Sequence, residues 1–168
     1  LLGDSLTAGN LGIPYSRYLN LPAEFRVFNR GRDGDTVLGI LARLDDALRS
    51  DGPDVAVVQV GANDMLLPEM TARGGAWKGF VDLIIAAGST PTPDPQLFSD
   101  RYADLLQRIS AWGTDRIVCV TVPPVGENLD SERNRKREEI NRRIRTAAGN
   151  GGALIADAAA EFEKELES

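Results

Sequence analysis

Short apolar runs alternate with segments of helical periodicity along most of the chain. Four runs have the length and apolar content of strands, and they span residues 26–28, 54–60, 116–122 and 153–156. Because they are continuous rather than alternating, they predict strands of a parallel sheet that is covered on both faces. Leu1 and Leu2 are too short a run for a whole strand, so we expect the sequence to begin inside a first strand.

Between these runs, apolar residues recur at intervals of three and four and predict three amphipathic helices. The first covers 37–48, after a cap at Thr36 and before the stop signal Ser50-Asp51-Gly52-Pro53. The second begins at Asp94 and Pro95, and the third runs from about Ser131 to near Gly149. The inward faces of the three helices are marked by Val37, Leu41, Leu44 and Leu48, by Phe98, Tyr102, Leu105, Leu106, Ile109 and Trp112, and by Ile140, Ile144 and Ala148.

Strands that alternate with helices imply right-handed crossovers, and so a doubly wound α/β fold with about five parallel strands and helices on both faces. A chain of 168 residues suits one hydrophobic core, so we expect residues 1–168 to form a single domain. Residues 65–96 depart from the alternation, and we expect a short helix in their middle. This segment is interpreted either as an extra helix packed on the sheet or as an insertion that covers the active edge.

Composition and charge narrow the classes of partner. The chain has 19 Lys and Arg against 25 Asp and Glu, for a net charge of −6, which disfavours nucleic acid binding because that needs a clustered basic surface. The longest nearly apolar stretch, 80–88, contains Asp82 and is too short for a membrane helix, so we expect no membrane-spanning segment. The single cysteine, Cys119, is expected to be a buried, inert thiol, and it does not distinguish a cytoplasmic from a secreted protein.

Polar segments follow the first three predicted strands and carry the residue types that acyl transfer requires. They are residues 3–6, 29–36 and 61–64, in which Ser5, Gly34 and Asn63 are spaced 29 positions apart, close to the ~30 residues of one βαβ unit. This spacing returns all three segments to one edge of the sheet. A serine at a strand end has a free backbone amide, a glycine allows a second amide to approach closely, and an asparagine carboxamide supplies a third oxyanion donor.

Each of these residues also has a purely structural interpretation. Ser5 taken alone fits a helix cap, Gly34 fits a turn glycine, and Asn63 fits a turn or cap residue. The order and spacing of the three residues therefore carry the chemical interpretation, rather than any one of them.

Three blocks of the chain match a known pattern in the right order: Leu2-Gly3-Asp4-Ser5-Leu6-Thr7-Ala8-Gly9, then Asn29 to Thr36, then Gly61-Ala62-Asn63-Asp64. They resemble the first three blocks of the SGNH (GDSL) hydrolases, and Pro123-Pro124 after the fourth strand fits the same order. The resemblance implies a flavodoxin-like sheet and hydrolysis of esters, thioesters or acetylated sugars without a metal or other cofactor.

The same resemblance assigns roles to individual residues. It places Ser5 as the nucleophile, and Gly34 (backbone) and Asn63 (side chain) as oxyanion-hole donors together with the Ser5 amide. Asp4, Asp35 and Asp64 also fall in matching blocks, and we interpret them as supports for the loops rather than as catalysts.

One departure from the family is serious, because its fourth block supplies an Asp and, three residues later, a His, and this sequence has no His. Serine needs a base to act as a nucleophile near neutral pH, so we expect the chain alone to be nearly inactive. We interpret the sequence as a fragment, cut at both ends, that stops before its base; retention of all three donors favours this. The alternative is a non-catalytic descendant that binds an acylated or carbohydrate ligand. Asp157 ends the last strand with no His after it and is expected to be structural.

The remaining features favour other functions less. The basic stretch 133–145 is interpreted as a solvated helix face, with Glu138–Arg142 and Glu139–Arg143 as ion pairs one helical turn apart. No GxGxxG or GxxxxGK[ST] run and no Cys/His cluster is present, so dinucleotide, P-loop and metal sites lack their defining residues. A flavodoxin-like phosphate binder with Ser5 and Thr7 as anion contacts remains a further alternative. The apolar content of 65–85 favours an acyl chain over a bare polar substrate.

Overall fold

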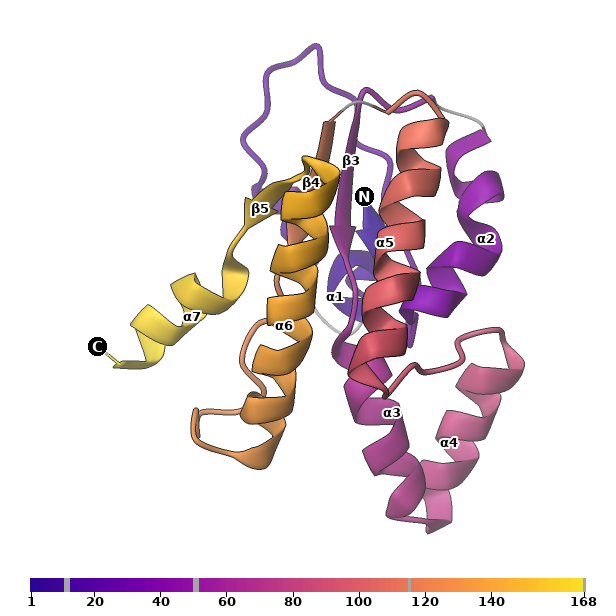
Figure 1. The fold of residues 1–168 in the computed structure, drawn as a ribbon, viewed down its shortest axis with the longest axis vertical. Coiled ribbons are helices and arrows are strands. Elements are labelled where there is room, and N and C mark those ends of the chain that lie inside the picture. The colour runs from indigo at the N-terminus through magenta and orange to yellow at the C-terminus, as the bar shows by residue number, and fades with distance from the viewer. Residues whose placement is uncertain (11–12, 50–51, 115, 168) are drawn as a thin grey trace.

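All neighbouring strands of the sheet run parallel (Figure 1). This computed structural model describes residues 1–10, 13–49, 52–114 and 116–167. Within them, five strands form one sheet in the order β2-β1-β3-β4-β5, the flavodoxin-like doubly wound order. The strands are β1 (Leu2–Gly3), β2 (Arg30–Gly31), β3 (Val55–Gln59), β4 (Arg116–Val120) and β5 (Leu154–Ala156). The predicted fold class is confirmed.

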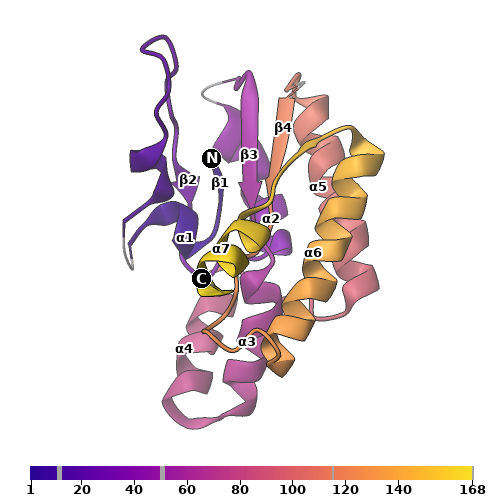
Figure 2. The ribbon, with the colours of Figure 1, turned by 90° about the vertical axis from the view of Figure 1, so that its left-hand side faces the viewer.

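Helices lie on both faces of this sheet. The helices, with one 3-10 turn η1 (Tyr15–Tyr18), are α1 (Ser5–Ala8), α2 (Val37–Arg49), α3 (Ala62–Ala72), α4 (Gly75–Ala86), α5 (Pro95–Ala111), α6 (Glu132–Gly151) and α7 (Ala158–Glu167). Figure 1 shows α2, α5 and α6 side by side on one face. Turned by 90°, Figure 2 shows the sheet close to edge-on, with α1 and α7 on the side of the strands away from α5 and α6. Because the strands are parallel, every β-to-α connection lies at the same edge of the sheet, at the carboxyl ends of the strands. The predicted polar segments lie at that edge.

The predicted helix starts are confirmed by their caps. Thr36 Oγ1 accepts a hydrogen bond from Gly39 N–H at 3.1 Å, and Asp94 Oδ1 accepts one from Leu97 N–H at 2.7 Å. Ser131 caps α6 in the same way. These side chains satisfy amides that have no partner within the helix, and so they fix where each helix begins. Ser50 and Asp51 of the predicted stop signal lie outside the described residues.

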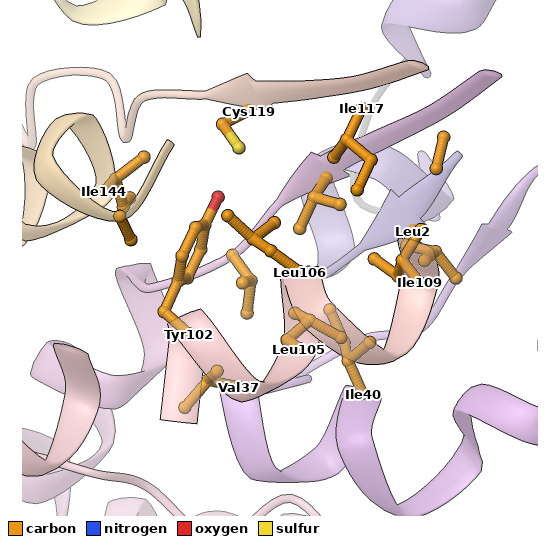
Figure 3. Packing of buried hydrophobic residues seen from close by; sticks show 14 of the residues in the cluster. Leu2, Val37, Ile40, Tyr102, Leu105, Leu106, Ile109, Ile117, Cys119 and Ile144 are labelled. Atoms are coloured by element: carbon orange, nitrogen blue, oxygen red, sulfur yellow. The ribbon is translucent and has the colours of Figure 1, made fainter. Parts of the chain in front are cut away.

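The core lies between the sheet and the α2–α5–α6 layer (Figure 3). Tyr102 of α5 is fully buried, and its hydroxyl points toward Cys119 of β4. Burial raises the pKa of the Cys119 thiol, so the thiolate that would react is disfavoured, as expected of an inert cysteine. Trp112 was expected on the inward face of α5, but it caps the helix and is 40% exposed.

The prediction of a strand at 26–28 was wrong. The second strand begins at Arg30, because Arg30 and Gly31 are the residues that pair with β1, opposite Leu2 and Gly3. Val27 is exposed. A short apolar run therefore marked the approach to the strand rather than the strand itself.

The prediction that every strand is covered on both faces of the sheet is wrong for β5. All three of its residues are exposed, and Leu154 is 65% exposed. β5 is the last strand of the described sheet, so a continuous apolar run does not by itself establish burial on two sides.

The basic face of α6 is mostly solvated, as expected, with two differences. Arg143 pairs with Glu139 at 2.9 Å as predicted, whereas Glu138 pairs with Arg145 instead of Arg142. Arg137 is buried and forms an ion pair with Glu163 of α7 at 2.5 Å. The helix thus uses one of its arginines to hold the next helix in place.

Residues 65–96 contain more helix than expected. α3 begins inside the third polar segment, at Ala62, and α4 follows after a tight turn. The two helices pack on one another, with Val81 fully buried, and project past the carboxyl edge of the sheet (Figure 1). Residues 87–94, which connect α4 to α5, contain no helix.

Candidate functional site

Ser5 is the first residue of the short helix α1, directly after the carboxyl end of β1. Asp4 caps this helix, since its Oδ1 accepts a hydrogen bond from Leu6 N–H at 3.0 Å. Neither the Ser5 hydroxyl nor its amide N–H has a hydrogen-bond partner among the described residues. Gly3 permits this sharp passage from strand to helix, because a Cβ there would lie 2.1 Å from Thr7 Oγ1.

Gly34 occupies a turn that only glycine fits. The turn is closed by a hydrogen bond from Asp35 N–H to Arg32 O at 3.1 Å, and Gly34 has a φ of +74°. A Cβ at Gly34 would also lie 2.8 Å from Ile84 Cγ2 of α4. The Gly34 amide N–H donates to no described acceptor, so it stays available to a ligand.

Hydrogen bonds join the three polar segments to one another. Arg32 N–H donates to Gly3 O at 3.0 Å, which ties the second segment to the end of β1. Asn63 Nδ2 donates to Asp35 O at 3.0 Å, which ties the third segment to the second. One N–H of the Asn63 carboxamide is used in this bond and the other is available. The structure therefore brings Ser5, Gly34 and Asn63 to one edge of the sheet.

Asp35 and Asp64 are fully buried beneath these segments. Arg43 donates to Asp35 Oδ2 through Nε at 2.8 Å and through Nη2 at 2.6 Å. Asp64 accepts hydrogen bonds from Val37 N–H at 3.1 Å and from Thr92 N–H at 3.0 Å. Burial raises the pKa of Asp35, and it raises the pKa of Asp64 to about 7. Both carboxyl groups bind the loops from the inside and are turned away from solvent.

Asp4 is likewise buried, and burial raises its pKa to about 6. Its Oδ2 has no hydrogen-bond partner among the described residues. Close by, Thr7 Oγ1 donates to Gln59 Oε1 at 3.1 Å and lies 3.4 Å from the Tyr15 hydroxyl. Sequence reasoning missed this polar cluster behind Ser5, although Gln59 is the one polar residue within the apolar run 55–60 and was a usable signal.

The connection between α4 and α5 is fastened to the second polar segment. Arg32 Nη2 donates to Ala87 O, and Thr36 Oγ1 donates to Thr90 O at 2.8 Å. Ser89 Oγ lies 3.4 Å from Asp35 Oδ1. These bonds hold α4 against Gly34, so the helix is a fixed neighbour of the site.

In the part of the chain that the structure describes, no side chain beside Ser5 is placed to act as a general base. The sequence has no His, and the carboxyl group of the adjacent residue, Asp4, caps α1. Within the described ranges, acidic and cysteine side chains do not gather in threes as a metal site requires. In the same ranges no helix is both long and apolar enough to cross a bilayer. Asp157 binds Thr121 and Arg145, as expected of a structural residue.

Comparison with known proteins supports the fold described above. Axe2, an acetylxylan esterase from Geobacillus stearothermophilus, superposes with a TM-score of 0.77 at 19% identity, over 99% of this chain and 78% of its own. The acetyl xylan esterase AlAXEase does so with a TM-score of 0.72 at 20% identity, over 96% and 77%. LAE5, an alpha/beta hydrolase enzyme from the metagenome of Lake Arreo, Spain, has a TM-score of 0.72 at 19% identity, over 99% and 78%.

At such identities these structures establish the fold alone. No curated protein matches the chain. The sequence model of the GDSL-like lipase/acylhydrolase family, in contrast, matches residues 1–167. This chain therefore belongs to the GDSL-like lipase/acylhydrolase family.

Proposed function

We propose that the protein hydrolyses a carboxylic ester through an acyl-enzyme on Ser5. The family supports ester hydrolysis in general. One observation supports the serine mechanism: four groups lie at the same edge of the sheet. They are the Ser5 hydroxyl, the unpartnered amides of Ser5 and Gly34, and the Asn63 carboxamide. Three donors around one hydroxyl are what a tetrahedral oxyanion needs.

In the proposed reaction, Ser5 Oγ forms a bond to the carbonyl carbon of the ester while a base takes its proton. The carbonyl oxygen becomes negative and accepts hydrogen bonds from Ser5 N–H, Gly34 N–H and Asn63 Nδ2. The bond to the alcohol oxygen then breaks, and the base returns the proton to the leaving alcohol. Water repeats the sequence and releases the acid from Ser5.

The base is proposed to be a histidine outside these 168 residues. In Axe2, alanine variants of a serine, an aspartate and a histidine three positions after that aspartate are named catalytic mutants. Since this sequence contains no His, the chain alone is proposed to be nearly inactive. Loss of the base in another serine hydrolase lowers kcat about a million-fold.

The test uses a gene product that contains this chain and any segment that follows it. We expect turnover of p-nitrophenyl acetate, loss of that turnover in Ser5→Ala, and covalent labelling of Ser5 by a fluorophosphonate. Ser110→Ala, an exposed serine on α5, is the matched control and should leave the rate unchanged. Equal rates for Ser5→Ala and the parent protein contradict the proposal.

The absence of His also favours a second candidate, a non-catalytic module that binds an acylated or carbohydrate ligand. This candidate predicts that the reading frame past Ser168 holds no Asp-x-x-His. It also predicts ligand binding without Ser5-dependent turnover. The two measurements together separate a binding module from an enzyme.

A further inference from the structure

Two aromatic side chains of α4 are half exposed, although the helix lies next to Gly34. Trp77 is 51% exposed and Phe80 is 50% exposed. Together with Ile84 they lie within one third of the helix circumference, because residues three, four and seven apart share a face. We call Trp77, Phe80 and Ile84 the α4 stripe.

The stripe begins at the proposed oxyanion hole. Ile84 is the side chain that would meet a Cβ at Gly34, with its Cγ2 at 2.8 Å and its Cδ1 at 3.0 Å. From there Phe80 and Trp77 follow along the helix, toward the free end of the α3–α4 hairpin (Figure 1). Seven residues of helix span about 10 Å, the length of about eight C–C bonds in an extended chain.

The chemistry of the stripe selects its occupant. The only charged residues of α4, Lys78 and Asp82, pair with each other at 2.6 Å and lie away from the stripe. The stripe thus offers mainly apolar contact, and its only polar side-chain atom is the indole Nε1 of Trp77, which is too few hydrogen-bond donors for the several hydroxyl groups of a sugar. It also lacks the Lys- and Arg-rich border by which an interfacial helix binds an anionic membrane.

We propose that the α4 stripe binds an unbranched apolar chain of the ester, of up to about eight carbons. This inference rests on the proposed function, since the ester carbonyl must lie at Gly34 for the chain to reach Ile84. The chain belongs either to the acyl group or to the alcohol, and the test below distinguishes the two. Hydrogen bonds from Arg32 and Thr36 to the 87–94 connection keep the stripe beside Gly34 before the substrate arrives.

The two tryptophans of the protein make the test selective. Trp77 lies on the stripe, whereas Trp112 caps α5 and donates to Asp45 Oδ1 at 3.2 Å. In Ser5→Ala/Trp112→Phe, titration with methyl acetate, methyl butyrate and methyl octanoate reports on Trp77 without turnover. We expect a blue shift of emission with methyl octanoate and a Kd that falls by up to about fourfold per methylene. Ser5→Ala/Trp77→Phe, in which only Trp112 emits, should not respond.

Phe80→Ser tests the stripe by affinity. We expect at least a tenfold higher Kd for methyl octanoate and an unchanged response to methyl acetate, while Leu154→Ser, on β5, changes neither. Heptyl acetate, an isomer of methyl octanoate, binds less tightly when the stripe takes the acyl chain and more tightly when it takes the alcohol chain.

Four results overturn the proposal. They are a Kd that does not depend on chain length, an equal response of Trp112, a Trp77 emission that shifts with protein concentration alone, and binding to phosphatidylcholine vesicles in place of monomeric esters. The third shows that a second copy covers the stripe, and the fourth shows that a lipid surface does. Ser5-dependent hydrolysis without chain-length dependence removes this inference and leaves the proposed function intact. Chain-length-dependent binding without Ser5-dependent hydrolysis removes the proposed function and leaves apolar binding at the α4 stripe intact.

Discussion

Asn63 Nδ2 donates a hydrogen bond to the backbone oxygen of Asp35 at 3.0 Å, so the proposed side-chain donor is held by the residue that follows the proposed glycine donor. The adjacent Asp64 accepts a hydrogen bond from Val37 N–H in return. These two hydrogen bonds, one donated by each loop to the other, thus set the distance between Gly34 and Asn63. The pairing of the strands does not determine that distance by itself.

Asn63→Ala removes both the bond to Asp35 and the third oxyanion donor. We expect kcat for p-nitrophenyl acetate to fall about 100- to 1000-fold with little change in KM, because the donor acts mainly on the transition state. The measurement is steady-state kinetics on a gene product that includes the base. Asn150→Ala, at an exposed position of α6, is the control. A change in KM alone contradicts a role for Asn63 in the oxyanion hole.

Gly34→Ala should destabilise the fold for two separable reasons. The residue has a φ of +74°, and the new Cβ would lie 2.8 Å from Ile84 Cγ2. We expect the free energy of unfolding in urea to fall by about 1–3 kcal/mol. Gly34→Ala on an Ile84→Ala background keeps the strain of φ but removes the overlap, so its added cost should be smaller. An equal cost on both backgrounds shows that Ile84 does not press on Gly34.

The sequence predicted the elements that depend on local chemistry. Thr36, Asp94 and Ser131 cap helices because a short side chain before an apolar period satisfies free amides wherever the helix lies in the fold. The expectation that Gly34 fits a turn is met for the same reason, since its turn chemistry is local.

Features that depend on pairing across the sheet or on burial were not predictable. β2 begins at Arg30 rather than Arg26, because its bounds follow from its ladder with β1. Arg137 is buried although the other basic residues of α6 are not, because α7 brings Glu163 to it from 26 positions away. The hydrogen bond between Asn63 and Asp35 belongs to this class too, since it joins two loops that are distant in the sequence.

Arg43→Met should destabilise the protein strongly. Arg43 forms the ion pair with Asp35, whose side chain is fully buried, and it also donates to Arg30 O at 2.8 Å. Its loss leaves the buried carboxylate without its ion-pair partner, which costs about 3–5 kcal/mol.

Urea unfolding of Arg43→Met and of Arg43→Met/Asp35→Asn tests this account. The double variant should be more stable than the single one, because it no longer buries an unpaired charge. If the second substitution adds a further loss instead, the pair is held by packing rather than by charge.

Stability should fall as pH rises from 5 to 7. Burial raises the pKa of Asp64 to about 7 and that of Asp4 to about 6, both from an ordinary value of 3.8. Between pH 5 and 7 the folded state therefore holds protons that the unfolded state has released, so raising the pH favours unfolding. Each group contributes at most about 1.4 kcal/mol per pH unit while it titrates. Glu69 and Asp157, whose pKa values are lowered by their cationic partners, act in the opposite direction but in the more acidic range.

Asp64→Asn separates the contribution of Asp64 from that of Asp4. Its carboxamide no longer titrates, and it satisfies only one of the Val37 and Thr92 amides, so the variant should be less stable than the parent at pH 5. The difference between parent and variant should shrink toward pH 8, because only the parent loses stability as Asp64 ionises. Free energies of unfolding from urea titrations at pH 5, 6, 7 and 8 give the two curves. Parallel curves would mean that Asp64 is already ionised in the folded protein at pH 5, and that its two hydrogen bonds outweigh the cost of burying its charge.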